Sequence, residues 1–286
     1  MNRVDIIYTC VEDSSVVRDS PRDAAEACLR LNAGNQAFAK LFENAGTRDE
    51  VRRRQIFVDA SDFGVLVRAG TPLRQTPFAA VLGCSDARVP LELIFNEGPN
   101  DLFVVRVAGN TLGDDVLGSL KYAADNLGRS LKVIVVIGHS GCGAVTAAVD
   151  MFLDPSGYLS LTSRDPIRML VDRLQIVIHA VALRVDQAFG ATIKSHPRYR
   201  DLLVETAIAT NAALAAHTLQ QAIDPDNSDL RTVYGVYVLS DRSVWAPRVG
   251  SDEVKGLASP PSTASDFVDV CNAALRSKRI IALMSN

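Results

Sequence analysis

Three short apolar runs, separated by helical patterns, constrain the fold of this chain more than any other feature. The runs are PFAAVLG at residues 77–83, LFVVRVA at 102–108 and LKVIVVI at 131–137, and each has the length and composition of a strand. Between the second and the third, residues 114–127 have a helical pattern, and Gly128 follows as the expected C′ glycine. Strands that alternate with helices are typical of a parallel sheet covered on both faces. The chain is therefore predicted to have an α/β fold.

The remaining patterns complete this fold. Residues 232–239 are predicted to form a late strand, and residues 243–245 an edge strand after a turn at Asp241 and Arg242. Further helices are expected from Pro21 onward and at residues 90–95, 141–153, 166–190, 198–223 and 264–276.

These elements predict a single domain at residues 21–250. It has a mainly parallel central sheet, with about four parallel strands plus an edge strand, flanked by helices and preceded by an N-terminal helical arm. The polar, weakly patterned residues 1–20 are predicted to be an N-terminal arm, and the Ser/Pro-rich residues 251–286 a C-terminal extension.

Composition excludes several classes of protein. The formal net charge is -3, and no basic face is concentrated enough to follow nucleic-acid phosphates. The N-terminus does not have the pattern of a secretory signal, and no uninterrupted apolar stretch approaches the length of a membrane span. The five cysteines are an odd number, which does not indicate a disulfide framework. We therefore expect a cytoplasmic protein with no nucleic-acid or membrane partner.

Unusual polar sequences follow two of the predicted strands. The first strand runs into CSDAR, which begins at Cys84, and the third runs into GHSGCG, which contains His139 and Cys142. The carboxyl ends of adjacent parallel strands lie at one edge of a sheet, where α/β proteins bind ligands. Two thiols and one imidazole suit tetrahedral zinc and leave a fourth position open, and glycines such as Gly141 let the backbone turn sharply. The sequence therefore predicts a zinc site made by Cys84, His139 and Cys142.

Asp86 and Arg88 lie two residues apart, so their side chains point the same way on an extended segment. One interpretation is a salt bridge that only ties the loop down. The other is that Arg88 fixes Asp86 by a charge-assisted hydrogen bond, so that Asp86 orients a hydroxide on the metal. Beside a predicted zinc site we favour the second.

Taken together, the segments CSDARVPLELIF, DLFVVRVAGN, LGSLKYAADNLG and VIVVIGHSGCGAV resemble the β-class carbonic anhydrase family. Upstream, LNAGNQAF at residues 31–38 is similar to that family's L-x-x-G-N-x-x-F helix signature. The resemblance implies one Zn²⁺ per chain on Cys84, His139 and Cys142, and a catalytic dyad of Asp86 and Arg88. It leaves the first 20 and the last 35 residues uncovered.

The resemblance also implies a substrate pocket. Gln75, Phe103 and Tyr122 match positions that line the cavity in plant-like members, where such residues come partly from the neighbouring subunit, and Gly141 is expected to line it too. On pattern alone, Phe103 and Tyr122 would serve equally well as core residues. Members with a second, inhibitory bicarbonate site carry tryptophan three positions before the first cysteine, but Val81 stands there in this chain. We therefore expect the open form of the site, with Asp86 paired to Arg88.

The implied activity is that of a carbonic anhydrase, a zinc lyase. Carbon dioxide is hydrated reversibly to bicarbonate and a proton, by attack of a zinc-bound hydroxide that the dyad orients. The resemblance further implies a homodimer or a higher multiple of dimers, and the terminal extensions suggest recruitment to a larger assembly. Two alternatives remain open, namely hydrolysis of carbonyl sulfide or carbon disulfide at the same centre, and a non-catalytic zinc protein with a regulatory or assembly role.

Overall fold

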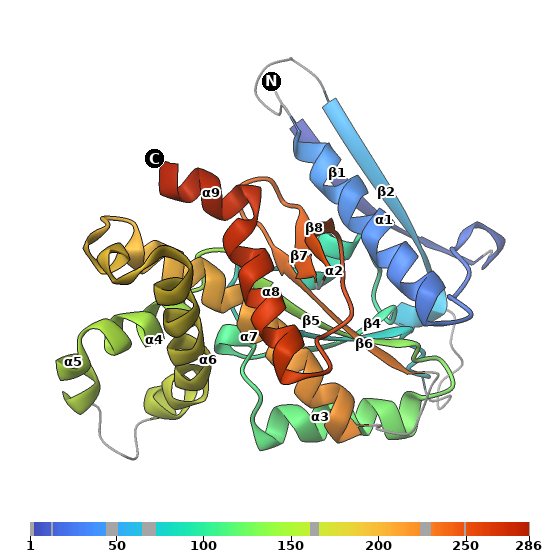
Figure 1. The fold of residues 1–286 in the computed structure, drawn as a ribbon. Helices are drawn as coiled ribbons and strands as arrows, with labels where there is room; N and C mark the ends of the chain where they lie inside the picture. The colour runs from blue at the N-terminus through green and yellow to red at the C-terminus, as the bar shows by residue number, and fades with distance from the viewer. Residues whose placement is uncertain are drawn as a thin grey trace.

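A six-stranded sheet forms the centre of the computed structural model, which describes residues 3–12, 14–43, 51–64, 73–160, 166–223, 230–248 and 250–285 (Figure 1). Its strands are β3 (Ala79–Gly83), β4 (Leu102–Arg106), β5 (Val133–His139), β6 (Arg231–Tyr237), β7 (Val244–Arg248) and β8 (Ser251–Lys255). They lie in the order β4-β3-β5-β6-β7-β8, with β4, β3, β5 and β6 parallel and the last two strands antiparallel. The predicted α/β fold, with four parallel strands and an edge strand, is confirmed, and β8 extends that edge beyond the prediction.

Helices cover both faces of this sheet. They are α1 (Ala24–Phe42), α2 (Leu91–Phe95), α3 (Asp114–Leu127), α4 (Gly143–Leu153), α5 (Pro155–Ser160), α6 (Pro166–Phe189), α7 (Tyr199–Ile223), α8 (Ala264–Arg276) and α9 (Lys278–Ser285). Alternate residues of each strand face opposite sides. In β3, Val81 packs with α1 and α2, whereas Leu82 packs with α3 and α7. In Figure 1, α4, α5 and α6 lie to one side of the sheet, with α7 between them and the strands.

The helix signature near the N-terminus has a packing role. Gly34 of α1 lies so close to α2 that an added Cβ would meet the carbonyl oxygen of Phe95 at 1.8 Å. The next residue, Asn35, is buried, donates from its side-chain nitrogen to the carbonyl oxygens of Ile94 and Arg242, and accepts from the N–H of Val244 at 2.7 Å. These two residues therefore join α1 to the helix that follows β3 and to strand β7.

The end of α3 differs from the prediction in one detail. Gly128 is the C-cap itself and has right-handed backbone angles, with φ -56°, so it is not a left-handed C′ glycine. A Cβ at this position would lie 2.9 Å from the carbonyl oxygen of Ala124. Close approach of the backbone, rather than a positive φ, is the reason that glycine fits here.

Two strands near the N-terminus form a separate small sheet that the sequence did not predict. Strand β1 (Arg3–Val11) lies within the predicted arm, and it pairs in parallel with β2 (Val51–Asp59). In Figure 1 these strands lie beside α1, at the upper right of the molecule. Residues 44–50, which precede β2, lie outside the described residues.

A buried acidic group attaches the N-terminal layer, which consists of β1, β2, α1 and the segment before α1, to the rest of the domain. Glu97 is fully buried, and its carboxylate accepts hydrogen bonds from Arg18 at 2.7 Å and from Arg30 of α1 at 2.6 Å. Arg30 also donates to Asp101 at 2.9 Å, and its guanidinium lies 4.4 Å from the centre of the Phe78 ring. Burial raises the pKa of Glu97 to about 7, against the opposing effect of the two arginines.

Asn96, the residue before Glu97, makes further contacts with the N-terminal layer. Asn96 has a left-handed backbone at the end of α2, and its side-chain oxygen accepts from Arg54 of β2 at 2.9 Å. Its carbonyl oxygen accepts from Arg18, while the Tyr8 hydroxyl of β1 donates to the carbonyl oxygen of Glu97. Contacts from β1, β2, α1 and the segment before α1 thus meet directly after α2.

Helix α7 is long and apolar enough to cross a membrane by length and composition, and it alone meets this test among the described residues. In the most apolar window of the helix, 78% of the residues are buried inside the protein. Its apolar residues contribute to the core on the α3 side of the sheet and to the packing with α4, α6 and α8.

The C-terminal extension is ordered against the domain. Helix α8 begins at a capping box formed by Thr263 and Asp266 and covers the residues predicted for it. Helix α9 and strand β8 were not predicted. Ser277, between the two helices, and Ile280 of α9 are both buried, so the extension packs on the domain as a folded element.

Candidate metal centre

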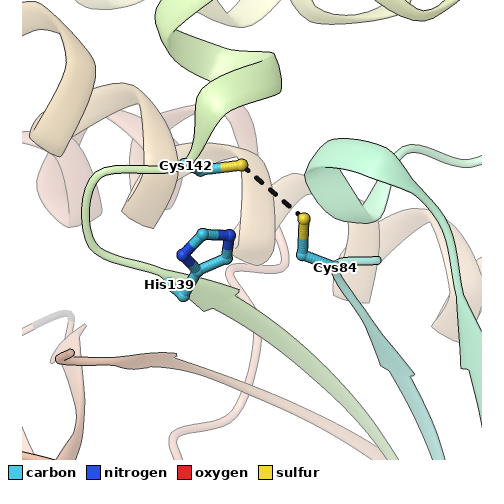
Figure 2. A group of neighbouring side chains, drawn as sticks. All are labelled: Cys84, His139 and Cys142. Atoms are coloured by element: carbon cyan, nitrogen blue, oxygen red, sulfur yellow. Dashed lines mark hydrogen bonds between the residues drawn. The ribbon is translucent and has the colours of Figure 1, made fainter. Parts of the chain in front are cut away.

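The predicted ligands meet at the carboxyl edge of the sheet. Cys84 follows β3, His139 is the last residue of β5, and Cys142 is the N-cap of α4. Strands β3 and β5 are paired neighbours with Gly83 opposite Ile137, so the segments that follow the two strands begin close together at the same edge of the sheet. The ligand atoms of the three residues all lie within 4.8 Å of one another, and the two Sγ atoms are 3.9 Å apart (Figure 2).

The imidazole of His139 is prepared to bind a cation. Its ring is fully buried, and Nδ1 lies 3.1 Å from the carbonyl oxygen of Ser140. Because a carbonyl oxygen only accepts, Nδ1 carries the proton and Nε2 carries the lone pair. Nε2 is buried without a hydrogen-bond partner among the described residues. A buried acceptor is costly to leave unpaired, and a metal ion would satisfy it.

The two buried thiols differ in acidity because they share one hydrogen bond. The hydrogen bond shared with Cys142 lowers the pKa of Cys84, and the N–H of Gly109, which donates to the Cys84 sulfur at 3.3 Å, acts in the same direction. The same shared hydrogen bond, together with burial, raises the pKa of Cys142. A divalent cation that bound both sulfurs would displace their thiol protons. The residues fit a zinc ion with three protein ligands.

Sequence reasoning missed one residue that shapes the loop after β3. Arg106, the last residue of β4, donates to the carbonyl oxygens of Cys84 at 3.0 Å and of Asp86 at 2.5 Å. It therefore fixes the backbone on both sides of Ser85. The segment DLFVVRVAGN contains this arginine, but only the register of β4 beside β3 shows which carbonyls it reaches.

Asp86 and Arg88 form the expected pair. Arg88 donates from Nε to Oδ1 of Asp86 at 2.9 Å and from Nη2 to Oδ2 at 2.6 Å, and its backbone N–H also donates to Oδ1. These bonds hold the pKa of Asp86 well below its usual range. Its Oδ2 lies 3.8 Å from Nε2 of His139, so the ionised carboxylate faces the ligand cluster.

The residues between His139 and Cys142 form a loop that is held by its neighbours. The N–H of Ser140 donates to the carbonyl oxygen of Tyr237, and its Oγ accepts from the N–H of Leu239 at 3.0 Å. Gly141 has a positive φ of 63°. Its N–H donates to the carboxylate of Glu205 in α7 at 2.8 Å, a contact that sequence reasoning also missed.

The other predicted pocket residues lie apart from this cluster within one chain. Phe103 pairs with Ala80 near the start of β3, four residues before Cys84, which places the two roughly 13 Å apart along the strand. Phe103 and Gln75 line a surface hollow of about 370 Å³ with Asp62 and Asn100. Tyr122 of α3 has an exposed side chain. Their role as substrate-pocket residues stays a prediction.

Comparison with known families matches this region of the chain. A family model described as carbonic anhydrase covers residues 79–241, which is more than half of the chain and includes every candidate ligand. The chain belongs to the β-class, prokaryotic-type carbonic anhydrase family. The whole C-terminal extension and the whole N-terminal layer lie outside the matched residues, which contain strands β3 to β6 and the candidate ligands.

Curated members of the family are similar over part of their length. Carbonic anhydrase 2 of Mycobacterium tuberculosis (strain ATCC 25618 / H37Rv) is 46% identical over 95 residues, which are 32% of this chain and 45% of that protein. Carbonic anhydrase of Mycolicibacterium smegmatis is 39% identical over 127 residues, which are 43% of this chain and 59% of that protein. The chain therefore matches less than two thirds of the length of these carbonic anhydrases.

Among solved structures, the β-carbonic anhydrase CcaA is similar over 68% of this chain and 82% of its own, with 25% identity and a TM-score of 0.48.

Proposed function

We propose that this carbonic anhydrase family member hydrates carbon dioxide reversibly to bicarbonate and a proton, with one zinc ion per chain held by Cys84, His139 and Cys142. The observation that supports this most is the buried cluster of two thiols and an unpartnered imidazole nitrogen, with the ionised Asp86 beside it. When bound, zinc supplies a Lewis acid that lowers the pKa of water and so makes a nucleophile available near neutral pH.

The chain's own residues orient the reacting groups. Asp86 is held as a carboxylate by three hydrogen bonds from Arg88, so it is an acceptor and not a donor. A carboxylate in this state accepts the hydrogen bond of the attacking water or hydroxide and fixes the direction of its lone pair. Arg106 keeps Asp86 in place by binding the carbonyl oxygen of that residue.

We further propose a cytoplasmic homodimer, or a multiple of dimers, in which the substrate pocket is completed across the subunit contact. Gln75, Phe103 and Tyr122 support this arrangement, because Phe103 and Gln75 lie at the far end of the strands from their own cluster and Tyr122 is exposed. All five cysteines are free, which supports a reducing compartment.

The direct test is stopped-flow measurement of carbon dioxide hydration by the purified protein, together with its zinc content. We expect about one zinc per chain and hydration that is faster in mildly alkaline solution than at pH 7. Protein with full zinc but no hydration at pH 7 or 8.5 would reject the proposal. Turnover of carbonyl sulfide or carbon disulfide in its place would identify the rival hydrolase, and failure of all three would leave a non-catalytic zinc protein.

Replacement of Asp86 by asparagine is expected to lower kcat/KM for hydration about 100-fold, because the amide no longer supplies an acceptor-only carboxylate to the nucleophile. Zinc content should stay the same. Asp125→Asn is the matched control, since Asp125 is an exposed acid paired with Lys121 on α3. Equal activities of the two variants would show that the Asp86–Arg88 pair only ties down the loop.

A further inference from the structure

One carboxylate outside the candidate ligands touches the loop at residues 139–142. Glu205 extends from α7, and its Oε1 accepts the N–H of Gly141 at 2.8 Å. This N–H belongs to the peptide bond between Ser140 and Gly141, midway between His139 and Cys142. Because Gly141 has a positive φ, the loop turns sharply at this residue, and a hydrogen bond here restrains the direction of the turn.

The other oxygen of Glu205 binds the C-terminal extension. Arg279 of α9 donates from Nε and Nη2 to Oε2 of Glu205, at 3.2 and 3.0 Å. The side chains of Glu205 and Arg279 are only 15% and 29% exposed, so the pair is partly shielded from solvent. The two oxygens of one carboxylate thus connect the extension to the loop between two candidate ligands.

Arg279 is held in position by the packing of its own helix. The next residue, Ile280, is buried, and its N–H donates to the Oγ of buried Ser277. Gly141, Glu205 and Arg279 all line a hollow of about 460 Å³ that residues of α7 and α9 form. The contact between the extension and α7 therefore reaches the loop itself.

Electrostatics explain why the carboxylate has a cationic partner. A carboxylate that is only 15% exposed is costly to leave without a cation beside it. Arg279 balances the charge of Glu205 while leaving Oε1 free to accept from the loop. Removal of a hydrogen-bond partner that orients the ligands of a metal typically lowers the metal affinity about 10- to 100-fold.

We propose that Glu205 is a positioning residue of the metal centre and that Arg279, from the C-terminal extension, orients it. The pair sets the retention of zinc by holding the peptide between His139 and Cys142. The inference rests on the zinc site of the proposed function but not on the reaction catalysed there. It gives α9 a role in the metal centre, although α9 lies outside the residues that match the family.

The test compares zinc dissociation from four full-length variants with the wild type, using excess chelator and a colorimetric zinc indicator. Glu205→Ala removes both contacts and should release zinc about 10- to 100-fold faster. Glu205→Gln keeps an oxygen for the N–H of Gly141 and should restore most of the wild-type rate. Arg279→Gln leaves the carboxylate without its partner and should fall between these two.

Arg200→Gln is the matched control. Arg200 lines the same hollow and forms a bidentate pair with Asp150, but it does not bind the loop. Its zinc dissociation should equal that of the wild type. The absorption spectrum of the Co²⁺-substituted protein gives a second readout, because its bands follow the geometry of the ligands. The bands should shift in Glu205→Ala and return in Glu205→Gln.

Two results would overturn the inference. One is an unchanged dissociation rate and Co²⁺ spectrum in Glu205→Ala. The other is an equal acceleration in Arg200→Gln, which would indicate a general loosening of the hollow. If Glu205→Ala does not fold, the zinc dissociation rates of the other three variants test the inference. Arg279→Gln should then release zinc faster than both Glu205→Gln and Arg200→Gln. Wild-type protein that binds zinc without hydrating carbon dioxide would reject the proposed function and leave this comparison valid.

Discussion

Replacement of Cys142 by serine should produce a protein that retains almost no zinc and hydrates carbon dioxide at least about 1,000-fold more slowly than the wild type. The serine hydroxyl stays protonated near neutral pH, so the site would keep only one thiol and one imidazole for the metal. Cys142 is almost completely buried, and its sulfur lies 3.9 Å from that of Cys84, so no other described cysteine is placed to substitute for it. Zinc analysis of the purified variant and stopped-flow hydration measure the two effects.

The control for this experiment is Cys10→Ser. Cys10 is an exposed thiol on β1, outside the cluster, so its loss should change neither zinc content nor activity. Thermal unfolding of both variants in the presence of a chelator shows whether the Cys142 variant still folds. Full zinc and full activity in folded Cys142→Ser would mean that the cluster is not the metal centre.

Replacement of Arg30 by methionine should lower the free energy of unfolding by about 3–5 kcal/mol at pH 8, the range seen when a buried ion pair loses one partner. Methionine keeps most of the apolar stem that packs near Phe78. It removes the hydrogen bonds to Glu97 and Asp101, so the fully buried carboxylate of Glu97 is left with Arg18 alone. Urea denaturation followed by circular dichroism measures the change.

The loss of unfolding free energy in Arg30→Met should be smaller at pH 5 than at pH 8. Arg30 lowers the pKa of Glu97, so its removal moves that pKa further above the wild-type value of about 7. A carboxyl group whose pKa is higher in the folded state than its unfolded value of about 4.3 does not reduce stability at a pH below that unfolded value. Stability is lost as the pH rises above it and through the pKa of the folded state. At pH 5, Glu97 is mainly neutral and needs its arginine less.

Arg22→Met provides the comparison. Arg22 pairs with Glu26 four residues later, and this pair lies at the surface, so its removal should change stability little at either pH. A deficit in Arg30→Met that is no larger than that in Arg22→Met, or that does not depend on pH, would show that Glu97 does not fasten the N-terminal layer.

The central strands and the ligands followed directly from the sequence because their signals are local. Each of the strands β3, β4 and β5 is a short apolar run, and α3 and α8 have the ends that their helical patterns predicted. Cys84, His139 and Cys142 come together because adjacent parallel strands end at one edge, which topology alone requires.

The missed elements depend on contacts between distant parts of the chain. Strand β1 pairs with β2, more than 40 residues later in the chain, as the register of Ile7 opposite Gln55 illustrates. Arg106 and Glu205 act on backbone groups far along the chain, so their neighbours in sequence carry no sign of their role. In the proposed dimer the substrate pocket is completed by residues of the second subunit. The sequence of one chain therefore indicates which residues belong to the pocket but not how they are arranged.

The pairing of β3 with β5 also makes assembly of the metal centre depend on correct folding of the sheet. Cys84 and Cys142 are 58 residues apart in sequence, so zinc can bind all three ligands only after this long-range pairing has formed. A slip of one residue between the strands would exchange the two faces of the sheet and displace Cys84 from His139 by about 3.3 Å. Zinc bound at this cluster would therefore favour the native register over its competitors, and without zinc we expect the chain to refold to that register less completely.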